Sequence, residues 1–152
     1  FERYEHPLFL SLLHNNYGIM FFNKGEYEEA KRHWEISLSF SSDTFTLQKM
    51  ITTANLASAV RKMGDIRQAE VLLEYYLKLL KESKFYQYYY GYFYNVALLD
   101  LSKKDVDSAI NNFKKSFIVS DPYPSKLIRS EMKRTFLREA KESGIEIESS
   151  IL

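Results

Sequence analysis

Residues 25–34 read GEYEEAKRHW, and two stretches of the same pattern follow, GDIRQAEVLL at 64–73 and KDVDSAINNF at 104–113. Each stretch has alanine at its sixth position and a large apolar side chain at its tenth. The alanines, Ala30, Ala69 and Ala109, are spaced by 39 (69 − 30) and 40 (109 − 69) residues. A repeat of this length indicates an array of similar units, each of which buries its apolar face against its neighbours.

The rest of the pattern is helical, because apolar residues recur at helical spacing and only five Gly and three Pro interrupt them. The alternation typical of a strand is absent. We expect a first helix that starts at Pro7, capping residues at 41–44 and at Ser125, a strong stop at 121–124 and a short polar tail after Gly144. The sequence therefore predicts an all-α fold with helices over residues 7–23, 26–40, 44–63, 65–81, 85–103, 105–119 and 125–143.

The expected domain organisation follows from these helices. Three helix pairs at about 8–41, 43–83 and 85–120 and a capping helix at 125–143 form one domain over residues 1–152. Because the sequence begins at Phe1 rather than at Met, we expect it to be a fragment of a longer chain.

Bulk composition excludes several classes of protein. With 152 residues and 45 % hydrophobic content the chain is long enough for one core, and a net charge of +1 creates no overall field to attract nucleic acid or a membrane surface. Cysteine is absent, which excludes disulfides, thiolate catalysis and sulfur-ligated zinc and suits a cytoplasmic protein. Every apolar run is far shorter than the roughly 18 residues of a membrane span.

Catalytic motifs are also missing. The histidines, His6, His14 and His33, form no H-E-x-x-H pattern, and the glycines form no phosphate-binding loop. We therefore expect no enzyme activity, no metal and no cofactor.

The helix pairs resemble tetratricopeptide repeats, whose pattern is W-x₂-L-G-x₂-Y…A-x₃-F. The matching residues are Tyr17, Gly18, Phe21, Ala30 and Trp34 in the first pair, Leu56, Ala57, Val60, Ala69 and Leu73 in the second, and Val96, Ala97, Ala109 and Phe113 in the third. The departures are His14, Thr53 and Phe93 in the Trp position, Asp100 in the third Tyr position, the absence from the first two pairs of the Pro that ends the family's pattern, and a period longer than the usual 34 or so. The resemblance implies a right-handed superhelical solenoid with a concave binding groove.

An asparagine follows the same register. Asn16, Asn55 and Asn95 each lie two residues before the small residue of the first helix in their pair. Asparagine inside a helix costs a few tenths of a kcal/mol relative to alanine, so three such positions call for a reason. Their amides could hold the backbone of an extended peptide. Chance, inheritance with the repeat, and hydrogen bonds between adjacent helices are the alternatives.

The long period together with these amides resembles the cytoplasmic peptide-pheromone receptors of Gram-positive bacteria. The resemblance implies that Asn16, Asn55 and Asn95 clamp a short peptide, and that a DNA-binding or other effector domain lies outside this sequence. Nucleic acid would then be contacted only through that absent domain.

Further groove candidates lie one turn along the same helix faces. They are Asn23, Arg61, which could pair with a peptide carboxylate or form a solvated helix end, and Tyr94. Tyr94 belongs to residues 85–94, where eight of ten residues are aromatic and cover all sides of a helix, so we expect them to divide between core packing and the groove. The basic last helix is expected to expose a wet outer face or to form a homodimer contact.

Our leading hypothesis is a quorum-sensing type of transcription regulator whose repeat domain senses a peptide. The alternatives are a tetratricopeptide scaffold, which binds a folded partner protein or a segment of one and no small ligand, and the repeat domain of a response-regulator phosphatase.

Overall fold

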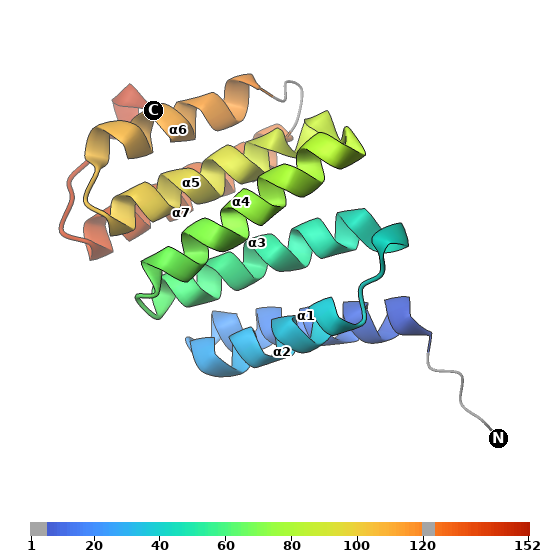
Figure 1. Cartoon of the computed structure of the whole chain (residues 1–152). Helices are drawn as coiled ribbons and strands as arrows, with labels where there is room; N and C mark the ends of the chain where they lie inside the picture. The colour runs from blue at the N-terminus through green and yellow to red at the C-terminus, as the bar shows by residue number, and fades with distance from the viewer. Residues whose placement is uncertain (1–5, 120–123) are drawn as a thin grey trace. The chain divides into compact units, whose positions relative to one another are not determined.

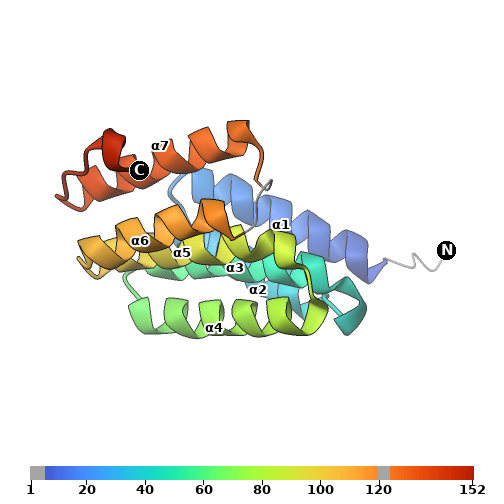
Figure 2. The same cartoon turned by 90° about the horizontal axis from the view of Figure 1, so that it is seen from above.

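The computed structural model describes residues 6–119 and 124–152, and within these ranges it contains helices and no strand (Figures 1 and 2). The all-α class is thereby confirmed for the described residues. The α-helices are α1 (Pro7–Asn23), α2 (Tyr27–Ser39), α3 (Thr46–Lys62), α4 (Ile66–Ser83), α5 (Tyr89–Ser102), α6 (Val106–Ile118) and α7 (Lys126–Glu142), with 3₁₀ turns η1 (Asp43–Phe45), η2 (Tyr86–Tyr88) and η3 (Ser149–Ile151).

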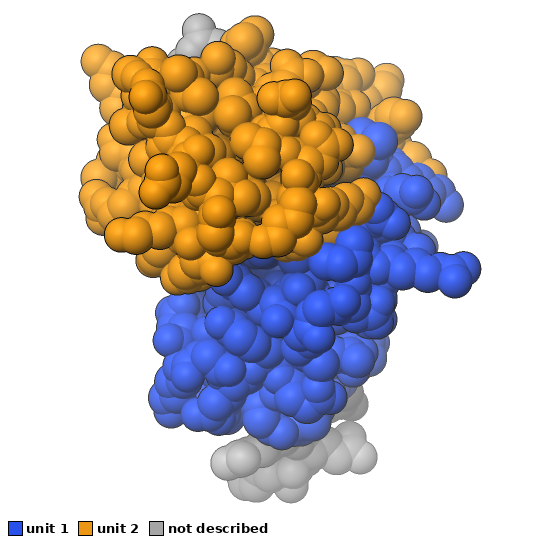
Figure 3. Space-filling model, turned by 90° about the vertical axis from the view of Figure 1, so that its left-hand side faces the viewer, with its two compact units in different colours: residues 1–79 blue, residues 80–152 orange. Residues whose placement is uncertain are grey.

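The chain divides into two compact units, residues 1–79 and residues 80–152 (Figure 3). Unit 1 holds α1 to α3 and most of α4, and unit 2 holds α5 to α7 and the C-terminal tail. The single domain expected over 1–152 stays a prediction.

The first helix of every pair ends in the same hydrogen-bonded turn. A residue with positive φ follows the helix, and the next backbone N–H donates to the carbonyl five residues back, which is the Schellman arrangement. The positive-φ residues are Gly25, Gly64, Lys104 and Gly144, with φ of 79°, 87°, 63° and 74°, and the donor–acceptor pairs are Glu26–Phe21, Asp65–Val60, Asp105–Asp100 and Ile145–Ala140 at 2.8–3.0 Å. The helix α7 therefore ends like α1, α3 and α5, as a fourth helix of the same type.

Unit 1 is built around the contact of Gly18 with Trp34. A Cβ added to Gly18 would lie 2.3 Å from the indole nitrogen of Trp34, so only glycine allows α1 and α2 to approach this closely. The indole N–H donates to the carbonyl oxygen of Asn15 at 3.1 Å, and Trp34 is 2 % exposed. The role predicted for the small residue of the first repeat is confirmed.

Unit 2 has a core of side chains from α5, α6 and α7, namely Ala97, Leu98, Leu101, Ala109, Phe113, Met132, Phe136 and Ala140. The tail after α7 adds to it, because Ile145, Ile147 and Leu152 pack against this core. The expectation of a merely polar tail is therefore wrong. Its isoleucines alternate with glutamates, which lets an extended segment bury one side and expose the other.

Helix starts differ from expectation at two places. Residues 43–45 form the turn η1 instead of the first turn of α3, and Tyr86–Tyr88 form η2 before α5. The side chain of Ser42 makes no capping hydrogen bond there. Ser125 is confirmed as the N-cap of α7, since its hydroxyl accepts from the Ile128 N–H at 3.4 Å. Residues 120–123, where most of the predicted stop lies, are outside the described residues.

Candidate functional site

The three asparagines predicted to line a groove have unlike surroundings. Asn16 on α1 is exposed. Asn55 on α3 is half-buried, and its amide nitrogen donates to the side-chain oxygen of Asn15 at 3.1 Å. Asn95 on α5 is half-buried and donates to the carbonyl of Gly91, one turn back in its own helix, at 2.8 Å. A hydrogen bond between adjacent helices, which the sequence left open as an alternative, is thus present for Asn55, whereas the bond from Asn95 to Gly91 lies within its own helix.

Asn15 is the buried amide of unit 1, and it is the residue that the sequence analysis missed. It is 5 % exposed, and its side-chain oxygen accepts from the hydroxyl of Thr52 at 3.3 Å as well as from Asn55. Its backbone carbonyl accepts from Trp34. This single residue therefore joins α1 to both α2 and α3. It is the neighbouring Asn16 that occupies the repeated position shared with Asn55 and Asn95, so nothing in the sequence pattern pointed to Asn15.

A row of hydroxyls continues this polar seam. The Ser37 hydroxyl donates to the carbonyl of Ser11 at 2.6 Å and lies 3.4 Å from the Thr52 hydroxyl oxygen. All three side chains are fully buried. Among the described residues, every buried side-chain nitrogen or oxygen has a hydrogen-bond partner. Because an unsatisfied buried polar group costs about 1–3 kcal/mol, this seam defines how α3 sits on α1 and α2.

The other predicted groove residues do not share one environment. Asn23 is exposed at the end of α1. Arg61 is 8 % exposed, so the expectation of a solvated helix end is wrong. Tyr94 packs edge-on against the buried Phe113, with ring centroids 6.2 Å apart, and belongs to the core of unit 2. Tyr94 is only half-buried, so its place in a groove stays a prediction.

The aromatic run at 85–94 divides as its pattern predicts. Tyr90 and Tyr94 pack against the core of unit 2, whereas Tyr86 is 59 % exposed. Burial raises the pKa of Tyr90 above its usual value, with the nearby Tyr88 adding to the effect. The run thus supplies both packing and accessible ring surface.

Two histidines form a stacked pair between α1 and α2. The Nδ1 atoms of His14 and His33 are 2.9 Å apart, and Nη2 of Arg32 is 3.1 Å from Nε2 of His33. Because a guanidinium only donates, Nε2 of His33 must accept. The proton of His33 is then on Nδ1, which donates to Nδ1 of His14, so both rings are neutral in this arrangement.

Burial lowers the pKa of His33 from its usual value, and the nearby Arg32 and His14 lower it further, while Glu29 opposes them. The unfolded chain then takes up a proton at His33 near pH 6.5, where the folded chain does not. We expect the stability to be highest above that pH and to fall as the pH drops from about 6.5 towards the lowered pKa. Urea midpoints measured between pH 7.5 and 5.5 test this.

The matched variant for that measurement is His33→Gln, which keeps a polar side chain that does not titrate. The variant should show a flatter dependence over the same interval. An equally steep loss of stability in the variant would assign the effect to other groups.

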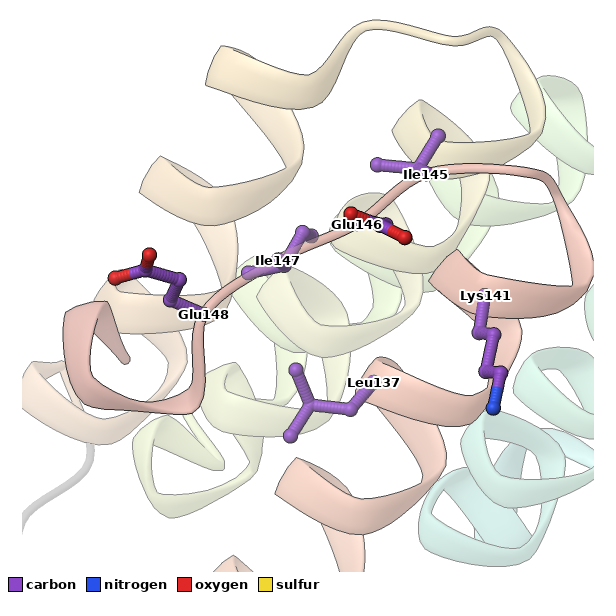
Figure 4. Close-up of a pocket in the computed structure, with 6 residues that line it drawn as sticks. All are labelled: Leu137, Lys141, Ile145, Glu146, Ile147 and Glu148. Carbon is purple, nitrogen blue, oxygen red and sulfur yellow. The ribbon is translucent and has the colours of Figure 1, made fainter.

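A hollow of about 560 Å³ lies between the end of α7 and the tail (Figure 4). Leu137 points from α7 towards the extended tail, and two glutamates lie along the same segment. The lining residues are Leu137, Lys141, Ile145, Glu146, Ile147 and Glu148. None of the predicted binding residues is among them.

No three His, Asp or Glu side chains in residues 6–119 and 124–152 are grouped so that they could hold a metal ion. In the same ranges, no helix combines the length and the apolar character that crossing a membrane requires. Comparison of the chain with protein-family models, with curated proteins and with solved structures gives no match.

Proposed function

We propose that this chain is a binding module of tetratricopeptide-like repeats, stacked as a right-handed solenoid, which holds an extended peptide and has no catalytic role. Following the resemblance to pheromone receptors, it would be the ligand-sensing part of a cytoplasmic transcription regulator. The observation that supports peptide binding best is that the repeated asparagines keep part of their surface accessible. Asn16 is exposed, and Asn55 and Asn95 are half-buried.

The chemistry of an amide suits this role. Each side chain offers one acceptor and two N–H donors, so an asparagine that makes one internal hydrogen bond can still pair with a peptide group. Apolar side chains flank Asn16 on the same helix, where Leu12 is 41 % and Ile19 is 40 % exposed. An extended peptide could place its backbone on the amide and its side chains on these neighbours.

Random peptides of about five to eight residues, titrated against the whole chain, test the proposal. We expect Asn16→Ala, Asn55→Ala and Asn95→Ala each to weaken binding about fivefold to tenfold, since a hydrogen bond contributes about 1 kcal/mol. Asn111→Ala is the matched control, because Asn111 is an exposed asparagine on α6, outside the repeated position. Unchanged binding in all three variants would remove the asparagines from the proposal.

A second candidate function is a scaffold for a folded partner protein. Strongly exposed apolar side chains of unit 2 favour it, since Ile118 is 75 % and Leu127 is 74 % exposed. The scaffold would be favoured over the sensor if the chain binds a partner protein stably, if the variant Leu127→Ser loses that binding, and if the chain binds no peptide.

A further inference from the structure

The helices α1 and α3 are equivalent members of successive repeats. Both are 17 residues long, and both end in the turn at Gly25 or Gly64, 39 residues apart (64 − 25). Each residue of α3 therefore corresponds to the α1 residue 39 positions earlier. This correspondence allows the surroundings of the two helices to be compared position by position.

One side of α3 packs on the first repeat. Thr52 and Asn55 lie on this side, since both donate to Asn15 of α1, and Thr52 also meets Ser37 of α2. Ala59 is one turn beyond Asn55 on the same side and is fully buried, as is Thr52. The interface between successive repeats thus runs along these positions of α3.

The equivalents of Thr52, Asn55 and Ala59 in α1 are Leu13, Asn16 and Met20. Phe9 extends the same side by one turn and corresponds to Gln48, whose amide donates to the Thr52 hydroxyl. These positions of α1 are open. Their spacing of four, three and four residues places them on one side of the helix. Phe9 is 62 % exposed and Met20 is 41 % exposed, Asn16 is exposed and Leu13 is half-buried. Large apolar side chains therefore lie in α1 where α3 buries a threonine and an alanine. We call this side of α1 the α1 stacking face.

We propose that the α1 stacking face binds a further helix pair of the same repeat type, which would sit on α1 as α1 and α2 sit on α3. The interface between the repeats of unit 1 would then continue by one more repeat. A helix that is apolar on all sides is normally enclosed on all sides, which α1 is not. The inference goes beyond the proposed peptide binding and does not depend on it.

The chemistry of the face specifies the occupant. Opposite Asn16 it needs an acceptor that plays the part of Asn15. Opposite Leu13 and Met20 it needs apolar side chains, or small ones such as Ser37, whose hydroxyl already donates to the carbonyl of Ser11 within its own repeat. Asn16 would become half-buried, like Asn55, and would keep part of its surface for a ligand.

The proposal can be tested with a tandem chain. In this chain an additional copy of residues 7–45 is inserted directly before residue 7 of the whole chain. This join keeps the natural spacing of 39 residues. Because the chain has no cysteine, the variant Met20→Cys in the second copy provides a single thiol on the face. We expect a thiol reagent to react with it about tenfold or more slowly in the tandem chain than in the single chain.

Two controls accompany the measurement. Met63→Cys, at a side chain 42 % exposed after α3, should react equally in both chains. A second tandem chain carries Phe9→Gln and Leu13→Thr in the second copy, which reproduces the face of α3 and shows the protection that a native repeat contact gives.

The proposal is overturned if the thiol stays fully reactive in the unaltered tandem chain while it is protected in the α3-like one. It is also overturned if the single chain dimerises on sedimentation and its Met20→Cys thiol loses reactivity with rising concentration. That outcome would assign the face to a second copy of the chain. Loss of peptide binding changes neither result, so failure of the proposed function stays distinguishable.

Discussion

Replacing Gly18 with alanine is expected to lower the free energy of unfolding by about 3 kcal/mol. The added methyl group would lie 2.3–2.5 Å from three atoms of the Trp34 ring, far inside van der Waals contact. Trp34 cannot swing away cheaply, because it is 2 % exposed and its N–H is held by the carbonyl of Asn15. The sign is informative, since alanine in a helix is otherwise favoured over glycine by about 1 kcal/mol.

The second repeat supplies the matched rescue. It has Ala57 where the first has Gly18, and Leu73 where the first has Trp34. The double variant Gly18→Ala with Trp34→Leu should therefore be more stable than the sum of the two single effects predicts. Urea unfolding followed by far-ultraviolet circular dichroism measures all three variants. A Gly18→Ala protein at least as stable as the original would contradict the close packing of α1 on α2.

Truncating Phe113 is expected to lower the free energy of unfolding by about 4 kcal/mol in the variant Phe113→Ala. The side chain is fully buried in unit 2. Its ring stacks on Phe136 with centroids 4.4 Å apart and meets Phe117 edge-on at 4.9 Å. Removing it leaves a cavity bordered by aromatic rings from α6 and α7, and stiff rings collapse poorly into such a space.

Phe113→Leu is the matched control for the truncation, because leucine fills the same repeat position at Leu73. It keeps most of the apolar volume, so we expect a loss of about 1 kcal/mol. Both variants can be compared by urea unfolding under the same conditions. Equal losses for the two variants would show that ring volume is not what stabilises this core.

Which of the predicted site residues are buried depends on tertiary contacts, and the spacing of residues along the sequence does not specify these contacts. Tyr94, which was expected in a groove, packs on Phe113, and the run at 85–94 is aromatic on every side of the helix, so its pattern cannot say which side is covered. Arg61 is a charged residue near the end of a helix, and such residues are usually exposed to solvent. In the fold, other residues of the same chain cover it and leave it 8 % exposed. The apolar residues of the tail are too few to form a periodic pattern, so their packing on unit 2 was not predicted.

The sequence by itself determined the helices and the pairing of α1 with α2 and of α5 with α6, because this information is local. Small residues at Gly18 and Ala30 allow close packing, and a turn such as that at Gly25 ends the first helix of a pair. Only the tertiary structure decided which amide is buried. Asn15 and Asn16 are identical in chemistry and differ by about 100° around the helix axis. The packing of α3 on α1 decided which side of α1 is covered, and it encloses the first amide and leaves the second exposed.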